Sequence, residues 1–516
     1  MRYFLAFSYN LHDSSVSIAD EERVLLVLEA ERYFGEKKKR CDHGEMERLI
    51  AVALAHCGIG IDQIDAVACT SYRNEHLAED SRDFKWVAER RVEIGGRSFD
   101  ALVLNHHLAH AAIVYAFPGA RDVVIDVCDG GGDFGDSHFI YRCRGRRIEQ
   151  LPNRPVHDAF SARFYDVMSR YLYRRRLCEG KMMALASLGQ VRPEMMGFIR
   201  EHLAMFHEAP PDDSCAELAR HYPVGEYMQS QIGFDLAASV QRVFEELRVQ
   251  SVAELPADAP QVLLAGGATL NILANTRVRE HLGPGRELLV PPVADDSGQS
   301  LGALLYLCHE RKDLPVTATM PFIGYSDRID DSVLAAADAG DELVSFLAGG
   351  GIAFLHRGQS EIGPRALGHR SIIAIPTPRS YDLINHVIKQ REFYRPVAPL
   401  VPEDVVSEWF EWEGESRYML FAAAARERTR LAAAGICHYD NTARLQTVAA
   451  GSDPFLHALL ARVGQATGCP ILINTSLNPR GVPILSTVNA TREFARTMQG
   501  LDVRVFHGGR LLPAGA

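Results

Sequence analysis

The sequence predicts an α/β protein, because strand-like and helix-like segments alternate along the chain. Residues 3–8 form a short apolar run typical of a strand, residues 44–57 have the spacing of an amphipathic helix, and residues 64–69 are strand-like again. A second observation is that the apolar runs at 122–128 and 261–265 each lead into consecutive glycines. Glycine turns after buried strands let the backbone come close to a ligand. The pattern therefore favours sheets covered by helices, with ligands approaching these turns.

The composition indicates a globular protein whose bulk charge does not favour large polyanions as partners. The 516 residues are enough for two or three domains, and 47% hydrophobic with 23% charged residues is typical of a soluble chain. The net charge of −11 does not favour nucleic acid or anionic membranes as partners. The ten cysteines include no Cys-x-x-Cys pair, which fits a reducing cytoplasm better than a disulfide framework. Residues 1–8 turn polar too soon for a signal peptide, and no apolar run reaches about 18 residues, so we expect a cytoplasmic protein without a membrane span.

Two histidines mark the first candidate site. His106 and His110 lie in a segment that suits a helix, and a spacing of four puts both rings on one face. That spacing suits two ligands of one metal, although a pair of hydrogen-bonded core histidines has the same pattern. Asp129 stands at the mouth of the glycine turn and adds a carboxylate suited to a divalent cation. Asp296, the second of two adjacent acids before a helix, is a fourth candidate.

The polar loop between the first two strands holds a candidate acid–base pair. His12 and Asp13 lie at the tip of a strand–loop–strand opening that resembles the phosphate loop of actin-like and sugar-kinase-like domains. They could take a proton from a bound hydroxyl, or they could be ordinary turn residues. The basic run at 37–40 leaves a similar choice between a solvated face and an anion site.

Other segments of the first half suggest nucleotide binding. Lys181, in a Glu-Gly-Lys sequence at a helix start, could present backbone N–H groups and a cation to an anion, but an ordinary helix cap fits as well. Gly266 and Gly267 follow a buried strand and precede a helix start near Asn271, an arrangement that favours nucleotides and phosphates. A looser segment at residues 315–326 follows the last helix of the first half, and we place a domain boundary there, giving domains 1–320 and 321–516.

The second half carries a concentration of cations in an acidic chain. From Arg357 to Arg395 there are seven Lys or Arg residues against three acids, in a stretch rich in glycine and proline. Arginine forks and a lysine point charge suit a polyphosphate, whereas a set of surface ion pairs is the alternative. The segments 440–447 and 474–478 add Arg444 and small hydroxyl donors such as Ser476.

The order of these motifs resembles the O-carbamoyltransferases of antibiotic and nodulation-factor biosynthesis, the nodulation protein U type that includes tobramycin and cephalosporin O-carbamoyltransferases. The resemblance runs from His12 to Asn478. Asp133 stands where the family usually has Glu, and Ser-Leu-Asn replaces its usual Ser-Phe-Asn. The motifs are HDSS, NHHLAHA, DGGGD, EGKMMALASLG, LAGGATLN, DDSGQSLGA, SEIGPRALGHRS, IKQREFYRPVAP, DNTARLQT and INTSLN.

The resemblance implies a fold and an activity. The first domain would be a duplicated actin-like (RNase H-like) fold similar to tRNA threonylcarbamoyl transferase, and the second a YrdC-like α/β domain. The second domain would convert carbamoyl phosphate and ATP into carbamoyl-adenylate. In the first domain a metal, Fe²⁺ or else Mn²⁺, Zn²⁺ or Mg²⁺, would help to deliver the carbamoyl group to a hydroxyl of a small-molecule acceptor.

The resemblance also assigns residues to these steps. The acceptor would meet His12, with Asp13 orienting the ring. The adenylate in the first domain is expected at the glycine turns and the two polar residues beside them. The implied metal ligands are His106, His110, Asp129 and Asp296; the carbamoyl phosphate and ATP site is Arg365, Lys389, Arg395, Arg444 and Ser476; the adenylate site is Gly130, Gly131, Lys181, Gly266, Gly267 and Asn271.

Two other classes of function stay open from the sequence. One is the modification of a nucleic acid, either threonylcarbamoylation of tRNA or carbamoylation of a hydroxymethylated base, which the net charge of −11 disfavours. The other is a binding protein without activity, derived from sugar kinases, which the intact cation cluster disfavours. The acceptor and the oligomeric state, including a homodimer, are not determined by the sequence.

Overall fold

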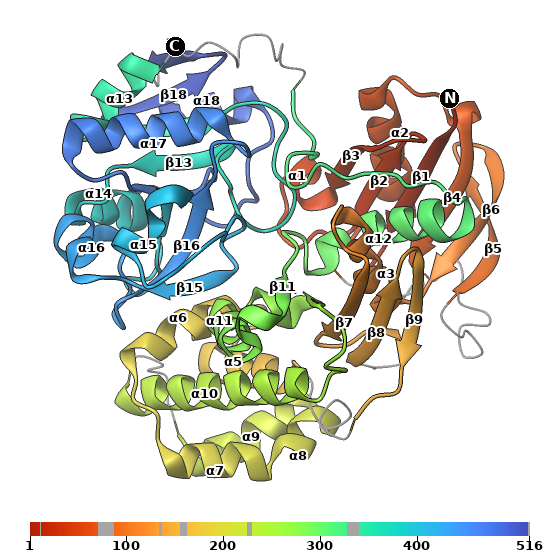
Figure 1. Ribbon diagram of the computed structural model, residues 1–516, viewed down its shortest axis with the longest axis horizontal. Helices are drawn as coiled ribbons and strands as arrows, with labels where there is room; N and C mark the ends of the chain where they lie inside the picture. The colour runs from red at the N-terminus through yellow and green to blue at the C-terminus, as the bar shows by residue number, and fades with distance from the viewer. Residues whose placement is uncertain are drawn as a thin grey trace. The chain divides into compact units, whose positions relative to one another are not determined.

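The computed structural model describes residues 1–10, 12–70, 87–133, 137–154, 162–223, 230–327 and 340–513. The chain forms two compact units. Unit 1 comprises Met1–Ala66, Glu93–Ser98 and Val316–Ala516, and unit 2 comprises Val67–Val92 and Phe99–Pro315. Helices pack against sheets in each unit (Figure 1), which confirms the predicted α/β class. The boundary expected at residue 320 lies close to one limit of these units, but the first 66 residues group with the C-terminal residues, and the division of function between domains stays a prediction.

The N-terminal strands form a six-stranded sheet in the order β3-β2-β1-β4-β6-β5. The first three strands are an antiparallel meander, and β4 and β6 run parallel. The strands are β1 (Tyr3–Ser8), β2 (Ser15–Ala19), β3 (Val24–Glu29), β4 (Ile64–Thr70), β5 (Val87–Ile94) and β6 (Arg97–Leu104).

Unit 2 contains a five-stranded sheet that repeats this connectivity. Its order is β11-β10-β7-β8-β9: again a three-stranded antiparallel meander, with the next two strands added on the side of its first strand. Apart from the additional edge strand β5 of the first sheet, both sheets have the strand order of RNase H-like folds, which confirms the expected duplication. The strands are β7 (Asp122–Cys128), β8 (His138–Arg144), β9 (Arg147–Leu151), β10 (Gln261–Ala265) and β11 (Glu287–Leu289).

The helices of unit 2 cover this sheet and extend beyond it. The long helix α10 packs against α11, and its apolar face meets the sheet in a core that includes Val124, Ile140, Val252 and Leu264. Helices α7 to α9 lie together beside α10 and α5 (Figure 1). No helix of the described residues combines the length and apolarity that crossing a membrane requires. The helices are α3 (His106–Ala112), α5 (Arg163–Tyr173), α6 (Glu179–Leu185), α7 (Pro193–Glu201), α8 (Leu203–Glu208), α9 (Pro211–His221), α10 (Gln231–Ala253), α11 (Ile272–Leu282) and α12 (Gln299–Tyr306).

The C-terminal part of unit 1 is built on a mixed eight-stranded sheet in the order β15-β16-β14-β17-β13-β12-β18-β19. Helices α13 and α17 pack together, and their core includes Leu347, Leu355, Leu460 and Leu472, all fully buried. The strands are β12 (Ile352–His356), β13 (Arg370–Ala374), β14 (Ala398–Pro402), β15 (Phe421–Ala424), β16 (Thr442–Val448), β17 (Leu472–Ser476), β18 (Val503–His507) and β19 (Arg510–Pro513). The helices of unit 1 are α1 (Ala30–Phe34), α2 (His43–Cys57), α13 (Gly340–Ala348), α14 (Pro378–Asp382), α15 (Val406–Trp409), α16 (Glu427–Ala432), α17 (Pro454–Thr467) and α18 (Val488–Arg496).

Candidate metal centre and anion site

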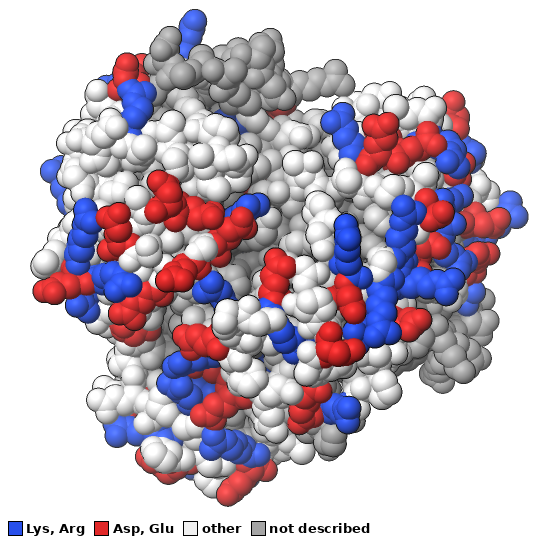
Figure 2. Space-filling model, viewed as in Figure 1, with Lys and Arg blue, Asp and Glu red and all other residues white. Residues whose placement is uncertain are grey.

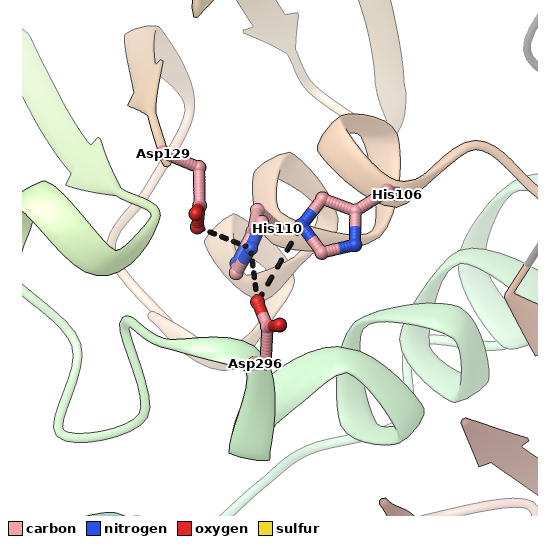
Figure 3. A group of neighbouring side chains, drawn as sticks. All are labelled: His106, His110, Asp129 and Asp296. Atoms are coloured by element: carbon pink, nitrogen blue, oxygen red, sulfur yellow. Dashed lines mark ion pairs between the residues drawn. The ribbon is translucent and has the colours of Figure 1, made fainter. Parts of the chain in front are cut away.

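Four side chains of unit 2 converge in the arrangement of a metal centre (Figure 3). One ligand atom each from His106, His110, Asp129 and Asp296 lies within 4.8 Å of all the others. The Nε2 atom of His110 is 3.3 Å from an oxygen of each carboxylate, and Nε2 of His106 is 3.4 Å from Asp296 Oδ1. Segments far apart in the sequence thus bring together the four residues named as ligands.

The start of helix α3 is held by the glycine turn that follows β7. Asn105 caps the helix, its side chain accepting the backbone N–H of His107. The carboxylate of Asp133 accepts two hydrogen bonds of 2.8 Å, from the Asn105 amide and from the His106 backbone N–H. Asp133 therefore orients the two-histidine face. In the sequence analysis Asp133 appeared only as a departure from the family's usual residue. Its position at the end of the glycine turn could have indicated its role in orienting the histidines.

A close helix pair places Asp296. This residue opens a short 3-10 turn directly before α12, and the Gln299 side chain of α12 donates to the backbone oxygen of His106 at 3.1 Å. A Cβ at Gly302 would lie 1.9 Å from the Ala109 carbonyl oxygen, so α3 and α12 approach at a distance that only glycine allows. This contact brings the start of α12 to the two histidines.

The two glycine turns meet at Asp129. Its Oδ1 accepts the Gly130 backbone N–H at 2.5 Å, and its Oδ2 accepts the Gly267 N–H at 2.8 Å. Gly266 has φ +85°, and a Cβ there would lie 2.3 Å from the Cys128 carbonyl oxygen. The predicted adenylate-binding glycines of both turns, with Gly131 in the first, therefore lie beside the metal ligands.

The electrostatics of the cluster suit a divalent cation. Burial disfavours the charged form of both imidazoles and lowers the pKa of His106. At His110 the carboxylates of Asp129 and Asp296 outweigh burial and raise the pKa to about 9. The buried Nε2 atom of His110 makes no hydrogen bond of normal geometry within the described residues, although two carboxylates flank it. Two imidazole nitrogens and two carboxylates form a donor set that suits Fe²⁺, Mn²⁺ or Zn²⁺, so the residues fit the expected metal.

The other two residues expected at the adenylate are engaged within the fold. The Asn271 amide caps α11 by accepting the Ala274 N–H at 3.1 Å, and it exchanges two hydrogen bonds of 3.0 Å with the Gln241 amide. Lys181 lies on α6 with its Nζ 5.8 Å from the centre of the Tyr173 ring. Asn271 thus supports the glycine turn through the start of α11, and a role of either residue at the adenylate stays a prediction.

Gly132→Ala should weaken metal binding roughly 10- to 100-fold, the size of effect seen when groups that orient metal ligands are lost. A Cβ at Gly132 would lie 2.4 Å from Cε1 of His107 and 3.0 Å from Cδ2 of His106, so either these buried rings or the turn that carries Asp133 must shift. Titration of the purified variant with Fe²⁺ or Mn²⁺ measures the affinity. Gly130→Ala is the matched control, because its Cβ meets nothing within 4 Å. Equal affinities of the two variants would contradict the role given to the turn.

The predicted acid–base pair of unit 1 forms a hydrogen-bonded group. His12 Nδ1 lies 2.9 Å from Asp13 Oδ2, and Lys38 Nζ donates to the same oxygen at 2.6 Å. Asp13 is buried, whereas the His12 side chain is 35% exposed. Holding Nδ1 fixes the orientation of the ring, as a general base requires.

Asp13→Asn should destabilise the protein at neutral pH by about 1.5–3 kcal/mol, the value of hydrogen bonds to a buried charge. Burial raises the pKa of Asp13, but Lys38 and His12 outweigh it and lower the pKa below its usual value. The carboxylate therefore contributes stability that is present above its unfolded pKa, about 3.9, and is lost as the pH falls through the lower folded value. Thermal unfolding of both proteins should show their difference shrinking below about pH 4. A constant difference down to the acid limit would contradict this assignment.

Four arginines of unit 1 form a cation cluster. Burial lowers the pKa of Arg444, and the charges of Arg365, Arg391 and Arg395 lower it further, well below its usual value. Burial, Arg395 and Arg365 likewise lower the pKa of Arg391 to about 9. Glu392, 3.7 Å from Arg395, offsets part of this charge. Clustered cations of this kind suit a polyanion. Three of the five predicted residues, Arg365, Arg395 and Arg444, thus lie near one another. Arg391, which was not predicted, lies with them, and its place in the same basic motif could have indicated it.

Lys389 lies at the cluster, and its ammonium group donates hydrogen bonds to other residues of the same chain. It is 2% exposed, and Nζ donates to the Ser476 carbonyl oxygen at 2.6 Å, to the Asn478 carbonyl oxygen at 2.7 Å and to the Asn478 side chain. Ser476 Oγ is 3.2 Å away. Lys389 therefore holds the turn that presents Ser476, and any contact with an anion would add to these bonds.

The basic run at 37–40 divides between the two interpretations. Lys37 lies near enough to the cluster that Arg391 and Arg395 help burial to lower its pKa. Lys39 pairs with Glu45 at 2.8 Å, and 14% of its side chain is exposed. Lys37 thus lies near the arginine cluster, and Lys39 is held in an ion pair.

Comparison with known proteins identifies the family. Residues 97–305 match the description "Carbamoyltransferase N-terminus" and residues 344–509 match "Carbamoyltransferase C-terminus". Nodulation protein NolO of Bradyrhizobium diazoefficiens is 32% identical over 78% of each chain, and nodulation protein NolNO of Sinorhizobium fredii is 28% identical over 96% of this chain and 78% of its own. The 3'-hydroxymethylcephem-O-carbamoyltransferase of Streptomyces clavuligerus is 31% identical over 58% of each chain.

The chain belongs to the carbamoyltransferase family, of the type that includes nodulation protein U. This confirms the resemblance drawn from the motifs and makes the protein a transferase.

Proposed function

We propose that the protein carbamoylates a hydroxyl group of a small-molecule acceptor, using carbamoyl phosphate and ATP through a carbamoyl-adenylate intermediate. The observation that carries this proposal is the cluster of Arg365, Arg391, Arg395 and Arg444 in a chain that also assembles a two-histidine, two-carboxylate centre. The first is suited to two polyanionic substrates and the second to a Lewis-acidic cation, and the family supplies the carbamoyl chemistry. We assign adenylate formation to residues 321–516 and carbamoyl transfer to residues 1–320.

The arginine cluster would serve adenylate formation. Carbamoyl phosphate and ATP repel each other, and bringing them together requires fixed positive charge in a site with little water. Arginine forks can bind phosphate oxygens in pairs, and the Ser476 hydroxyl adds a neutral donor. Hydrolysis of carbamoyl phosphate would break its bond to phosphate, releasing inorganic phosphate and leaving carbamate. An oxygen of the carbamate would then attack the α-phosphate of ATP, forming carbamoyl-adenylate with pyrophosphate as the leaving group.

The residues of the metal centre would serve the transfer step. His106, His110, Asp129 and Asp296 would hold the divalent cation, which as a Lewis acid polarises a carbonyl or phosphate oxygen. His12, oriented by Asp13, takes the proton of the acceptor hydroxyl as the C–O bond to the carbamoyl carbon forms. AMP is the leaving group. Exclusion of water protects the adenylate from hydrolysis.

The acceptor is proposed to be a small polyhydroxylated or amino-bearing metabolite. The cephem relative acts, by its name, on a hydroxymethyl group of a small molecule. Among the described residues on the face drawn in Figure 2, Lys and Arg are interspersed with Asp and Glu, and the net charge is −11. A surface of mixed sign fits a small acceptor better than the phosphate backbone of a nucleic acid.

The test combines the full-length protein with Fe²⁺, ATP and labelled carbamoyl phosphate. Pyrophosphate release and label transfer are followed with a panel of sugars, amino sugars and hydroxymethyl compounds, and with tRNA and hydroxymethylated DNA in parallel. We expect pyrophosphate release that depends on carbamoyl phosphate, and a stable O-carbamoyl product on a small alcohol. Turnover on a nucleic acid alone would contradict the acceptor class. Absence of any carbamoyl-phosphate-dependent pyrophosphate release would contradict the adenylate route.

A further inference from the structure

A buried ion pair near the start of the chain binds both backbone polar groups of one distant glycine. Glu29 ends β3 and Arg32 lies in α1; their side chains are 5% and 2% exposed, and Arg32 Nε pairs with a Glu29 oxygen. The backbone N–H of Gly363 donates to Glu29 Oε1 at 2.9 Å, and Arg32 Nη2 donates to the Gly363 carbonyl oxygen at 2.6 Å. All three residues belong to unit 1.

Gly363 lies in the loop between β12 and β13 that carries Arg365. Its φ of +87° is in the left-handed region, so the loop turns at this glycine. The buried Glu361 carboxylate holds the part of the loop that follows Arg365. Its Oε1 accepts the backbone N–H groups of Leu367 at 2.5 Å and Arg370 at 3.3 Å. The backbone is therefore held on both sides of the arginine.

Neighbouring backbone bonds extend the same attachment. The Val27 N–H of β3 donates to the Ile323 carbonyl oxygen at 2.8 Å, and the Gly324 N–H donates to the Ser360 carbonyl oxygen at 2.9 Å. Strand β3, the segment around residue 323 and the start of the Arg365 loop thus lie side by side. The Glu29–Arg32 ion pair extends this contact to Gly363, farther along the Arg365 loop.

Stability alone does not account for the pair. Desolvation of two buried charges consumes most of their attraction, and well-packed apolar residues often serve stability equally well. Apolar side chains could not, however, bind one N–H and one C=O of the same glycine. We propose that Glu29 and Arg32 are positioning residues for Arg365, and that they hold its loop so that the guanidinium faces a polyphosphate anion. The inference rests on the anion site of the proposed function.

The test measures binding of inorganic pyrophosphate by calorimetry, so that it does not depend on turnover. Wild type, Arg32→Met, Arg365→Met and the double variant form a mutant cycle. We expect Arg32→Met to weaken binding roughly tenfold, and to add little once Arg365 has been replaced, because the first change acts through the second residue. Arg32→Lys keeps the charge without the planar fork and should fall between Arg32→Met and wild type.

Controls separate positioning from stability. Leu460→Ala changes the core of unit 1 and should cause a loss of thermal stability comparable with that of Arg32→Met. Because it does not alter the Arg365 loop, it should leave pyrophosphate affinity unchanged. If Arg32→Met does not fold, Glu29→Gln takes its place in the cycle. Unchanged affinity in a folded Arg32 or Glu29 variant, a fully additive cycle, or no measurable binding by wild type would overturn the inference. Pyrophosphate binding with the expected cycle, but without carbamoyl transfer, would instead overturn only the proposed function.

Discussion

His110→Ala should abolish carbamoyl transfer while leaving carbamoyl-phosphate- and ATP-dependent pyrophosphate release largely intact. His110 Nε2 lies 3.3 Å from an oxygen of Asp129 and of Asp296, so its loss removes the ligand nearest to both carboxylates. Loss of a Lewis acid worth several kcal/mol should lower transfer by roughly 10²- to 10⁴-fold. The arginines assigned to adenylate formation lie beyond residue 357 and belong to unit 1, so that step should continue.

The measurement follows pyrophosphate release and product formation in the same preparation, with metal content determined. Two adjacent acids provide a matched control: Asp296→Asn should lose metal and transfer, whereas Asp295→Asn should retain metal, because only Asp296 belongs to the ligand cluster. A parallel fall of both activities in folded His110→Ala would show that the two steps share one composite site.

Arg444→Met should lower adenylate formation by roughly one to three orders of magnitude, since a charge-assisted contact in a dry site is worth about 2–4 kcal/mol. The same substitution should not destabilise the protein without its anion. Burial and three neighbouring arginines lower the pKa of Arg444, so removing its charge relieves repulsion inside the cluster. Function and stability are therefore expected to change in opposite directions, as at sites that are strained for binding.

Pyrophosphate release and thermal unfolding, each with and without carbamoyl phosphate, measure both effects. Arg428→Met is the control, because Arg428 is exposed and pairs with Glu408 at 2.8 Å on the surface of the same unit. It should leave both quantities close to wild type. A normal rate of adenylate formation in Arg444→Met would remove Arg444 from the anion site, and a large loss of stability without ligand would mean that its role is structural.

Several features followed from the sequence because they depend on local geometry. A spacing of four on a helix places His106 and His110 on one face whatever the rest of the fold does. Glycines after a buried strand predict a turn whose backbone can come close to another group. In the structure the backbone N–H groups of Gly130 and Gly267 donate to the Asp129 carboxylate. The alternation of strands and helices defined the α/β class, and the order of the motifs identified the family.

Other features were decided only by the tertiary structure, because they depend on which distant segments pack together. Nothing local distinguishes Asp295 from Asp296; the close approach of α3 and α12 at Gly302 brings the second to the histidines. Lys389 lies in a basic motif that the sequence analysis assigned to phosphate binding. Its ammonium group instead donates hydrogen bonds to oxygens of a turn that begins 87 residues later. The first 66 residues group with the C-terminal half, and Arg32 of α1 and Glu29 of β3 bind Gly363 there. These contacts join residues more than 300 positions apart, which no local sequence pattern indicates.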